Sequence, residues 1–226
     1  LPGQGGSPFN VPIIWYGRPL GSAFPSPNSP KDIFQYHWSN SLMFNISEDM
    51  NFELSLTASE HENKHNRPDT IESRFEAAIL GEGGPNGNEQ WNIFLPLENS
   101  ESLIDYIKGS ETSIKTGGLI SMDGILTGQT QGMNFALGFQ LNSEDLEINY
   151  SEASRAIFDS DGKLIKGADL LFLGGGKNVT TGRNKQAIFF ETNKNFGDSL
   201  DLILSGRYEK LKNDSSFDPK FSFKYF

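Results

Sequence analysis

Residues 34–46 read Phe-Gln-Tyr-His-Trp-Ser-Asn-Ser-Leu-Met-Phe-Asn-Ile, and this stretch indicates the fold class most directly. From Phe34 to Ile46, large apolar side chains stand at almost every second position, and polar or small side chains stand between them. Because successive side chains of a β-strand point to opposite faces, this alternation predicts a strand with one apolar and one polar face. A short polar turn follows, and residues 50–58 repeat the pattern, which predicts a β-hairpin.

The same alternation returns further along the chain, in segments separated by links of two kinds. The later alternating segments are residues 120–126, 133–141, 185–192, 200–208 and 221–225. The links near residues 47–49, 127–132 and 195–198 are short, whereas those near 59–114, 143–183 and 209–218 are longer. A strict succession of short and long links is typical of transmembrane β-barrels, which have short periplasmic turns and long extracellular loops. We therefore expect an all-β chain in which residues 34–226 form seven or eight antiparallel strands of a barrel, and residues 1–33 form a further extracellular loop.

The charged side chains predict which face meets lipid. Polar faces of the expected strands carry Glu53, Asp123, Asp201 and Arg207, and Glu209 follows on the same face. An Arg or Lys on the lipid face at mid-bilayer costs about 2–4 kcal/mol. The apolar rows are therefore expected to meet lipid and the polar rows a water-filled lumen. A soluble β-sandwich remains open, because one-sided alternation describes it too.

Composition excludes several other classes. The 226 residues include no Cys, so neither disulfides nor thiolate metal sites can form. The net charge is −10 and no basic stripe is visible, which argues against a nucleic-acid partner. No apolar run approaches the ~18 residues of a membrane helix. The chain starts at Leu1 without an initiating Met, which leads us to expect a processed chain or a fragment.

Three short motifs with possible chemistry are interpreted as loops. His61-Glu62-Asn63-Lys64-His65 matches a zinc-protease pattern, but that chemistry needs a helix, and no apolar stripe supports one here. Asp159-Ser160-Asp161-Gly162 lacks the later ligands of a calcium loop and predicts an Asx-type turn. Residues 174–177 (Gly-Gly-Gly-Lys) lack the spacing of a phosphate loop. We expect no enzyme, no metal site and no cofactor.

Several segments together carry a family resemblance. They are Arg67-Pro68-Asp69-Thr70, residues 77–86 with Gly-Glu-Gly-Gly-Pro-Asn, Trp91-Asn92-Ile93-Phe94, residues 136–140, Gly206-Arg207-Tyr208-Glu209 and residues 217–225 with Phe-Asp-Pro-Lys. Their order over roughly residues 34–226 resembles the middle of the barrel of TonB-dependent outer-membrane receptors. This resemblance implies part of a larger, plugged barrel in the outer membrane of a Gram-negative bacterium.

The resemblance also implies a function and partners. Such receptors import a scarce ligand, such as a ferric siderophore, cobalamin or an oligosaccharide, using energy delivered by TonB. The expected partners are outer-membrane lipid, the receptor's own plug domain, TonB and the imported ligand. The external aromatic residues expected to stack on a ligand are Trp15, Tyr16, Trp91 and Phe94, with packing inside the loops as the alternative. The residues expected to face the lumen and contact the plug are Glu53, Asp123, Asp201, Arg207 and Glu209.

Two other functions stay open on the sequence. A soluble β-sandwich that binds carbohydrate through loop aromatics would share the alternation, and a passive porin-type barrel would share the membrane location but lack a plug. Ligand identity depends on loop and plug residues, which a fold-level resemblance does not supply.

Overall fold

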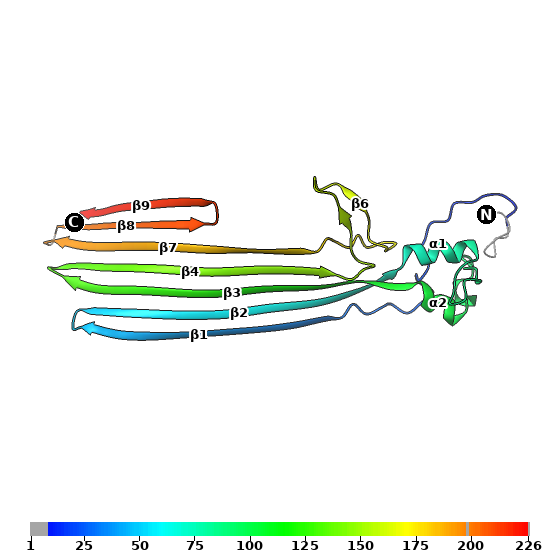
Figure 1. Ribbon diagram of the computed structural model, residues 1–226, viewed down its shortest axis with the longest axis horizontal. Coiled ribbons are helices and arrows are strands. Elements are labelled where there is room, and N and C mark those ends of the chain that lie inside the picture. The colour runs from blue at the N-terminus through cyan, green and yellow to red at the C-terminus, as the bar shows by residue number, and fades with distance from the viewer. Residues whose placement is uncertain (1–8, 198, 226) are drawn as a thin grey trace. The chain divides into compact units, whose positions relative to one another are not determined.

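The computed structural model describes residues 9–197 and 199–225, and these residues form an all-β chain. Seven strands make one antiparallel sheet in the order β1-β2-β3-β4-β7-β8-β9, so the strands pair in the order in which they follow one another in the chain, with β5 and β6 left out between β4 and β7 (Figure 1). The strands are β1 (Lys31–Ser47), β2 (Met50–Thr70), β3 (Lys108–Thr130), β4 (Met133–Tyr150), β7 (Val179–Phe196), β8 (Leu200–Leu211) and β9 (Asp214–Tyr225). The prediction of seven or eight antiparallel strands is confirmed at this level.

Tight turns join the strands at one end. The turn between β3 and β4 consists of Gln131 and Gly132, with φ of 46° and 71°. Two successive positive φ values are the signature of the type I′ turn, whose twist matches that of paired strands. The short links predicted near residues 47–49, 127–132 and 195–198 all occur, although residue 198 lies outside the described residues.

The prediction of a third long link near residues 209–218 is wrong. Strands β8 and β9 are joined by Lys212 and Asn213 alone, and the pairing runs unbroken from Leu211↔Asp214 to Leu200↔Tyr225. The polar residues of this segment suggested a loop, but they pair as an ordinary hairpin whose ends are exposed. The succession of short and long links therefore holds only for the first five.

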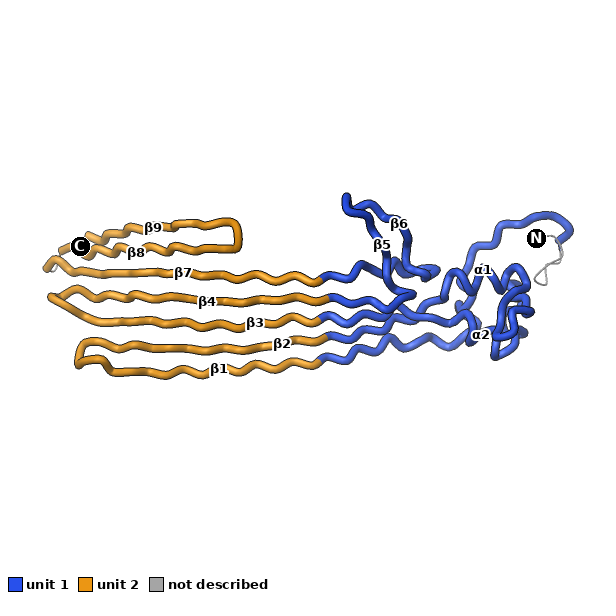
Figure 2. Tube along the Cα trace, in the orientation of Figure 1, with its two compact units in different colours: residues 1–33, 63–115, 148–179 blue, residues 34–62, 116–147, 180–226 orange. Residues whose placement is uncertain are grey.

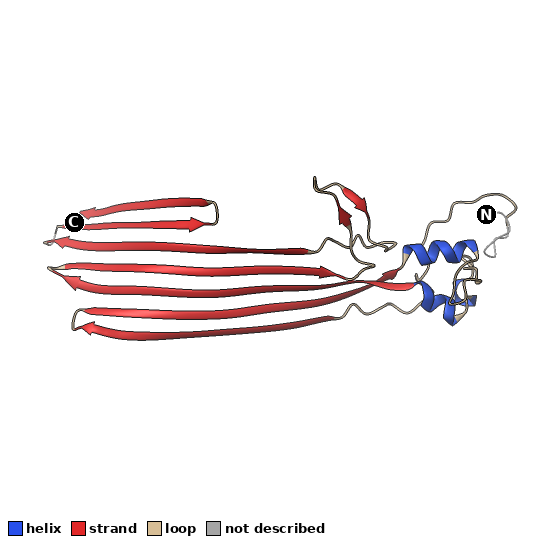
Figure 3. Cartoon of the chain, viewed as in Figure 1, coloured by secondary structure: helices blue, strands red, loops and turns tan. Residues whose placement is uncertain are grey.

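The first long link is more ordered than the sequence predicted. It contains α1 (Glu72–Leu80), the 3₁₀ helix η1 (Pro96–Glu98) and α2 (Glu101–Ile107), which Figure 3 shows in blue. Helix α1 ends at Gly81, which adopts a left-handed conformation with φ of 85°. Helix α2 begins after Ser100, whose hydroxyl accepts a hydrogen bond from the Leu103 amide at 3.0 Å. Among the described residues, no helix has the length and apolar character needed to cross a membrane.

The chain divides into two compact units, which Figure 2 colours separately. Unit 1 contains residues 1–33, 63–115 and 148–179, and unit 2 contains residues 34–62, 116–147 and 180–226. Unit 1 holds the buried core, which consists of Phe75, Ala78, Trp91, Leu103 and Ile107. It also contains a small second sheet formed by β5 (Ile157–Phe158) and β6 (Leu164–Lys166).

Two short motifs fold without the chemistry their sequences suggested. His61 and His65 lie in the extended strand β2, where four residues span about 13 Å, too far for one metal ion. The predicted Asx-type turn is confirmed, because Asp159 Oδ1 accepts hydrogen bonds from the amides of Asp161 at 3.0 Å and Lys163 at 2.8 Å. Gly162 closes this turn with a φ of 80°.

Candidate functional site

One face of the sheet in unit 2 is apolar and open to solvent. Its exposed large side chains include Phe34, Trp38, Leu42, Phe44, Leu137, Ile188, Leu204, Phe221 and Phe223. Ile188 is 60% exposed and Phe221 is 64% exposed, so no second layer covers them within the described part of unit 2. Water-soluble proteins rarely expose a continuous apolar surface that crosses several strands. This face is therefore the candidate surface of unit 2 for contact with an apolar partner.

Contacts between neighbouring strands show that these rows share one face. Phe44 stacks on Phe52 across the β1–β2 hairpin, with ring centroids 6.2 Å apart. Gly128 has no Cβ, and the space a Cβ would take is occupied by Phe135 and Met50. In the same way, Phe190 and Phe217 close over Gly206. Glycine thus lets large side chains from adjacent strands cover the backbone of the strand between them.

In four of the seven strands the apolar rows have a common length. In β2, β4, β8 and β9 they occupy residues 50–58, 133–141, 200–208 and 217–225, which is nine positions each. Beyond the row the same face becomes polar, with Glu60 after Ala58 in β2 and Ser143 after Leu141 in β4. A membrane-crossing β-strand needs about 9–11 residues. The apolar band therefore matches the hydrocarbon layer of a bilayer in height.

The opposite face carries a connected polar network. Arg207 donates to Gln140 Oε1 at 3.0 Å and to Glu209 Oε2 at 2.9 Å. Gln140 in turn donates to Asp123 Oδ1 at 2.6 Å, and Asp123 Oδ2 accepts from Ser121 at 2.7 Å. The network joins strands β3, β4 and β8. Three of the residues predicted to face a lumen, Asp123, Arg207 and Glu209, therefore belong to a single hydrogen-bonded group.

The other two predicted lumen residues lie outside that network. Glu53 accepts a hydrogen bond from Ser55 at 3.3 Å, on the same face as the Ser41–Ser55 hydroxyl pair at 2.6 Å. Asp201 pairs in register with Asn195 of β7 and Lys224 of β9. The sequence placed all five residues on the polar face of their strands, but it did not identify Gln140, which links Arg207 to Asp123.

A phenylalanine ring of β7 contacts this network beside a glycine. Phe189 of β7 pairs in register with Arg207, and the guanidinium carbon of Arg207 is 5.8 Å from the centroid of its ring. The ring lies against Gly138, where a Cβ would collide with Phe189 and approach the Gly124 carbonyl oxygen to 2.8 Å. The Phe189 ring therefore occupies the space that a side chain at residue 138 would need.

Replacing Gly138 with valine is expected to lower the free energy of unfolding by about 1–3 kcal/mol, because overpacking displaces the Phe189 ring. Denaturant unfolding of the natural chain, followed by tryptophan fluorescence, measures this change. Gly167→Val is the matched control, since nothing lies within 4 Å of a Cβ at Gly167. Equal stability of the two variants would contradict the packing described for Phe189.

The predicted ligand-stacking aromatics of unit 1 differ in exposure. Trp91 is fully buried, and its ring meets Phe75 edge-on with centroids 6.2 Å apart, so it has no open face for a ligand. Trp15 also packs on this core and lies 6.3 Å from Phe75. Phe94 is half-buried and contacts Phe9, whereas Tyr16 is 88% exposed. Packing inside the loops, the stated alternative, therefore describes Trp91.

Polar contacts tie distant segments of unit 1 together. Glu111, which is 5% exposed, accepts hydrogen bonds from Arg67 and from the Gly175 amide, the latter at 3.0 Å. Asp169 accepts from both the amide and the hydroxyl of Ser73, at 2.8 and 2.6 Å. These contacts join residues 44 to 96 positions apart in the sequence, and the Ser73–Asp169 pair holds the second link against the start of α1.

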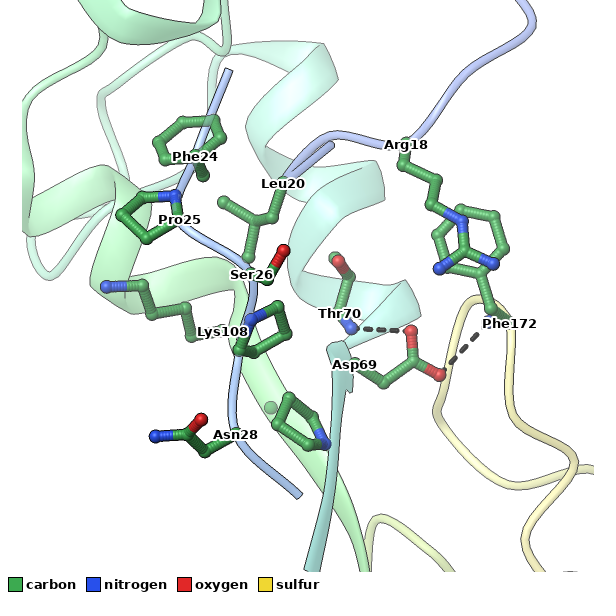
Figure 4. A pocket seen from close by; sticks show the side chains of 13 residues that line it. Arg18, Leu20, Phe24, Pro25, Ser26, Asn28, Asp69, Thr70, Lys108 and Phe172 are labelled. Atoms are coloured by element: carbon green, nitrogen blue, oxygen red, sulfur yellow. Dashed lines mark hydrogen bonds between the residues drawn. The ribbon is translucent and has the colours of Figure 1, made fainter. Parts of the chain in front are cut away.

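A pocket of about 530 Å³ opens among these segments of unit 1 (Figure 4). Its lining combines the N-terminal segment, the ends of β2 and β3, and the second link. The lining residues are Arg18, Leu20, Phe24, Pro25, Ser26, Pro27, Asn28, Pro68, Asp69, Thr70, Lys108, Gly109 and Phe172. None of these was identified as a ligand-binding residue from the sequence, because they come together only through long-range contacts.

A group of cations surrounds His65 elsewhere in unit 1. Partial desolvation and the nearby cations Lys31 and Arg67 hold the pKa of His65 below its ordinary value. The imidazole is therefore neutral near pH 7, and its Nε2 lies 3.4 Å from the Ser29 hydroxyl. Among residues 9–197 and 199–225, no cluster of three or more His, Cys, Asp or Glu side chains is arranged to hold a metal ion.

Comparison with known proteins adds no assignment. No protein-family model matches the chain, and no curated protein matches it.

Proposed function

We propose that this chain forms part of the wall of an outer-membrane receptor for TonB-dependent uptake. The observation that supports the proposal most strongly is the difference between the two faces of the sheet in unit 2. One face exposes large apolar side chains across neighbouring strands, and the other carries the Arg207–Gln140–Asp123 network. A sheet with lipid on one side and a wet lumen on the other requires this arrangement.

The height of the apolar band supports the membrane location. Nine positions of a strand rise about 30 Å before tilt, and strands in barrels are tilted by ~35–45°. The tilted band then covers about 21–25 Å, close to the apolar band of outer-membrane barrels. The polar residues that follow on the same face, such as Glu60 and Ser143, mark the place where the surface would leave the hydrocarbon.

Unit 1 supports a role in ligand capture rather than passive passage. Both long links contribute residues to the core around Trp91, and they are braced by the contacts of the buried Glu111 and of Asp169. Loops of this length are usually functional when they are ordered. In the proposed receptor they would present a fixed surface to the imported ligand, which belongs to the class of ferric siderophores, cobalamins or oligosaccharides.

The two alternatives lack a supporting observation of this kind. A soluble β-sandwich needs a second sheet over the apolar rows, and within the described residues the only other sheet is the β5–β6 pair. A passive porin-type barrel shares the two-faced sheet. The order of the Gly-Gly-Pro, Trp-Asn-Ile-Phe and Asp-Pro-Lys segments favours the receptor over the porin.

The natural chain that contains this sequence is expected to stay in the membrane fraction after carbonate extraction and to conduct few ions in a planar bilayer. Membrane retention tests the lipid-facing rows, and low conductance tests the plugged lumen. Release of the chain into water would contradict the membrane location. Retention with large, steady conductance would instead support the porin.

A further inference from the structure

The pocket of unit 1 has the size and lining of a small-molecule site. Its volume of about 530 Å³ lies within the range of about 300–1,000 Å³ that is usual for ligand pockets. Leu20, Phe24 and three prolines supply rigid apolar walls, and Ser26 and Asn28 add hydrogen-bonding groups. Leu20 and Phe24 also pack against the core around Trp91, so this wall is fixed from behind.

The acidic residue of the pocket is already occupied. Asp69 Oδ1 accepts a hydrogen bond from the Thr70 amide at 2.7 Å. Its Oδ2 accepts from the amides of Phe172 at 3.1 Å and Leu173 at 2.7 Å, and Figure 4 shows the bonds to Thr70 and Phe172. Three amide donors thus satisfy the carboxylate, which holds the second link in place. Asp69 is therefore a structural residue and a poor partner for a cationic ligand.

The guanidinium of Arg18, in contrast, is available. It lies over the ring of Phe172, with Cζ 4.6 Å from the ring centroid, and this stacking fixes its plane (Figure 4). Within the described residues, no carboxylate forms an ion pair with Arg18. A stacked guanidinium keeps its edge N–H groups free, and they match the two oxygens of a carboxylate or phosphate.

The second cationic side chain of the lining, Lys108, also favours binding of an anion in the pocket. Lys108 lines the pocket from the start of β3, and its Nζ binds Asp105 at 2.6 Å. Both partners of that ion pair are more than half exposed, so the pair is weak and exchangeable. The lining therefore contains two cations, Arg18 and Lys108, against the single, fully hydrogen-bonded Asp69.

We propose that this pocket binds a small organic anion, in which Arg18 holds a carboxylate or phosphate group and the Phe24–Leu20 wall holds an apolar or aromatic body. The site is built entirely from residues of unit 1. The proposed anion binding therefore does not require that the sheet of unit 2 lies in a membrane. In the proposed receptor it would restrict the ligand to molecules that carry an accessible anionic group.

Saturation-transfer NMR on the natural chain tests this with benzoate, phenyl phosphate and the neutral benzamide. Benzoate and benzamide share size and shape, so their difference reports the charge. One of the two anions is expected to bind about tenfold more tightly than benzamide, the effect of one charge-assisted hydrogen-bonded pair. Arg18→Gln is expected to reduce anion binding to the benzamide level, and Arg18→Lys to retain part of the preference.

Arg183→Gln removes the same charge from unit 2, where Arg183 pairs with Glu144, and is expected to leave binding unchanged. The proposal is overturned if no anion gives saturation transfer, if benzamide binds as tightly as both anions, or if Arg18→Gln binds like the unaltered chain. If carbonate released the chain from the membrane fraction and the chain still bound the anion, the proposed receptor function would be overturned. The proposed anion site would remain supported.

Discussion

Replacing Leu204 with arginine is expected to lower the fraction of chain that inserts stably into lipid vesicles by about thirty- to a thousandfold. Leu204 is the middle position of the apolar row in β8, pairs with Thr192 and Phe221, and is 46% exposed. An arginine at mid-bilayer on the lipid face costs about 2–4 kcal/mol, which corresponds to this change. Resistance of the inserted chain to trypsin gives the inserted fraction.

The neighbouring Ser205→Arg variant is the matched control. Ser205 lies on the polar face, where its register partners are Glu191 and Lys220. An arginine there meets water and a carboxylate, so insertion is expected to stay near that of the unaltered chain. If both variants insert equally well, or if Ser205→Arg is the more harmful, then the assignment of the lipid-facing side is wrong.

Replacing Trp91 with alanine is expected to destabilise unit 1 by about 3–5 kcal/mol. Trp91 is the largest fully buried side chain, and its removal leaves a cavity lined by Phe75, Ala78 and Leu103. Both helices pack on this core, so the loss should open the whole first link. Hydrogen exchange of the amides in residues 71–107, measured by mass spectrometry, is expected to accelerate strongly.

Tyr16→Ala removes another of the predicted ligand-stacking aromatics and serves as its control. Tyr16 is 88% exposed, and substitutions at such sites usually change stability by less than about 0.5 kcal/mol. The exchange of residues 71–107 should be unaffected. A Trp91→Ala chain with unchanged exchange would show that the helices are held by the polar contacts alone and not by the buried ring.

The strands could be predicted wherever one face is apolar, but not where both faces are polar. Strand β2 continues from Ala58 to Thr70 although Glu60, Glu62 and Lys64 replace the apolar row. Backbone hydrogen bonds to the neighbouring strand extend β2 here. A search for apolar side chains at every second position cannot detect this extension. For the same reason the segment around Lys212 resembled a long loop and is a two-residue turn.

The helices of the first link left weaker signals. Ser100 and Gly81 are ordinary capping residues, but α1 has nine residues and α2 only seven, too short for a clear helical repeat. Their stability comes from burial of Trp91 and Ile107, which depends on tertiary contacts. A residue inside such a core and a residue on a ligand-binding surface have the same appearance in a sequence, which is why the sequence left both ligand stacking and packing inside a loop open for Trp91.

The pocket could not be predicted from the sequence at all. Asp69 and Phe172 lie 103 positions apart, and their contact forms one of its walls. The residues on the polar face of unit 2 could be predicted, because the positions of Asp123, Arg207 and Glu209 each follow from local alternation. Their connection through Gln140 joins side chains from three strands, which local alternation does not predict.

The transition from apolar to polar residues on the apolar face of unit 2 sets the depth at which the proposed receptor would sit. Glu60 in β2 and Ser143 in β4 each follow the last apolar side chain of their row. A bilayer much thicker than that band would have to cover carboxylates and hydroxyls with acyl chains, at a cost of fractions of a kcal/mol for each ångström of mismatch. The same rows that anchor the sheet would thus also select thin membranes over thick ones.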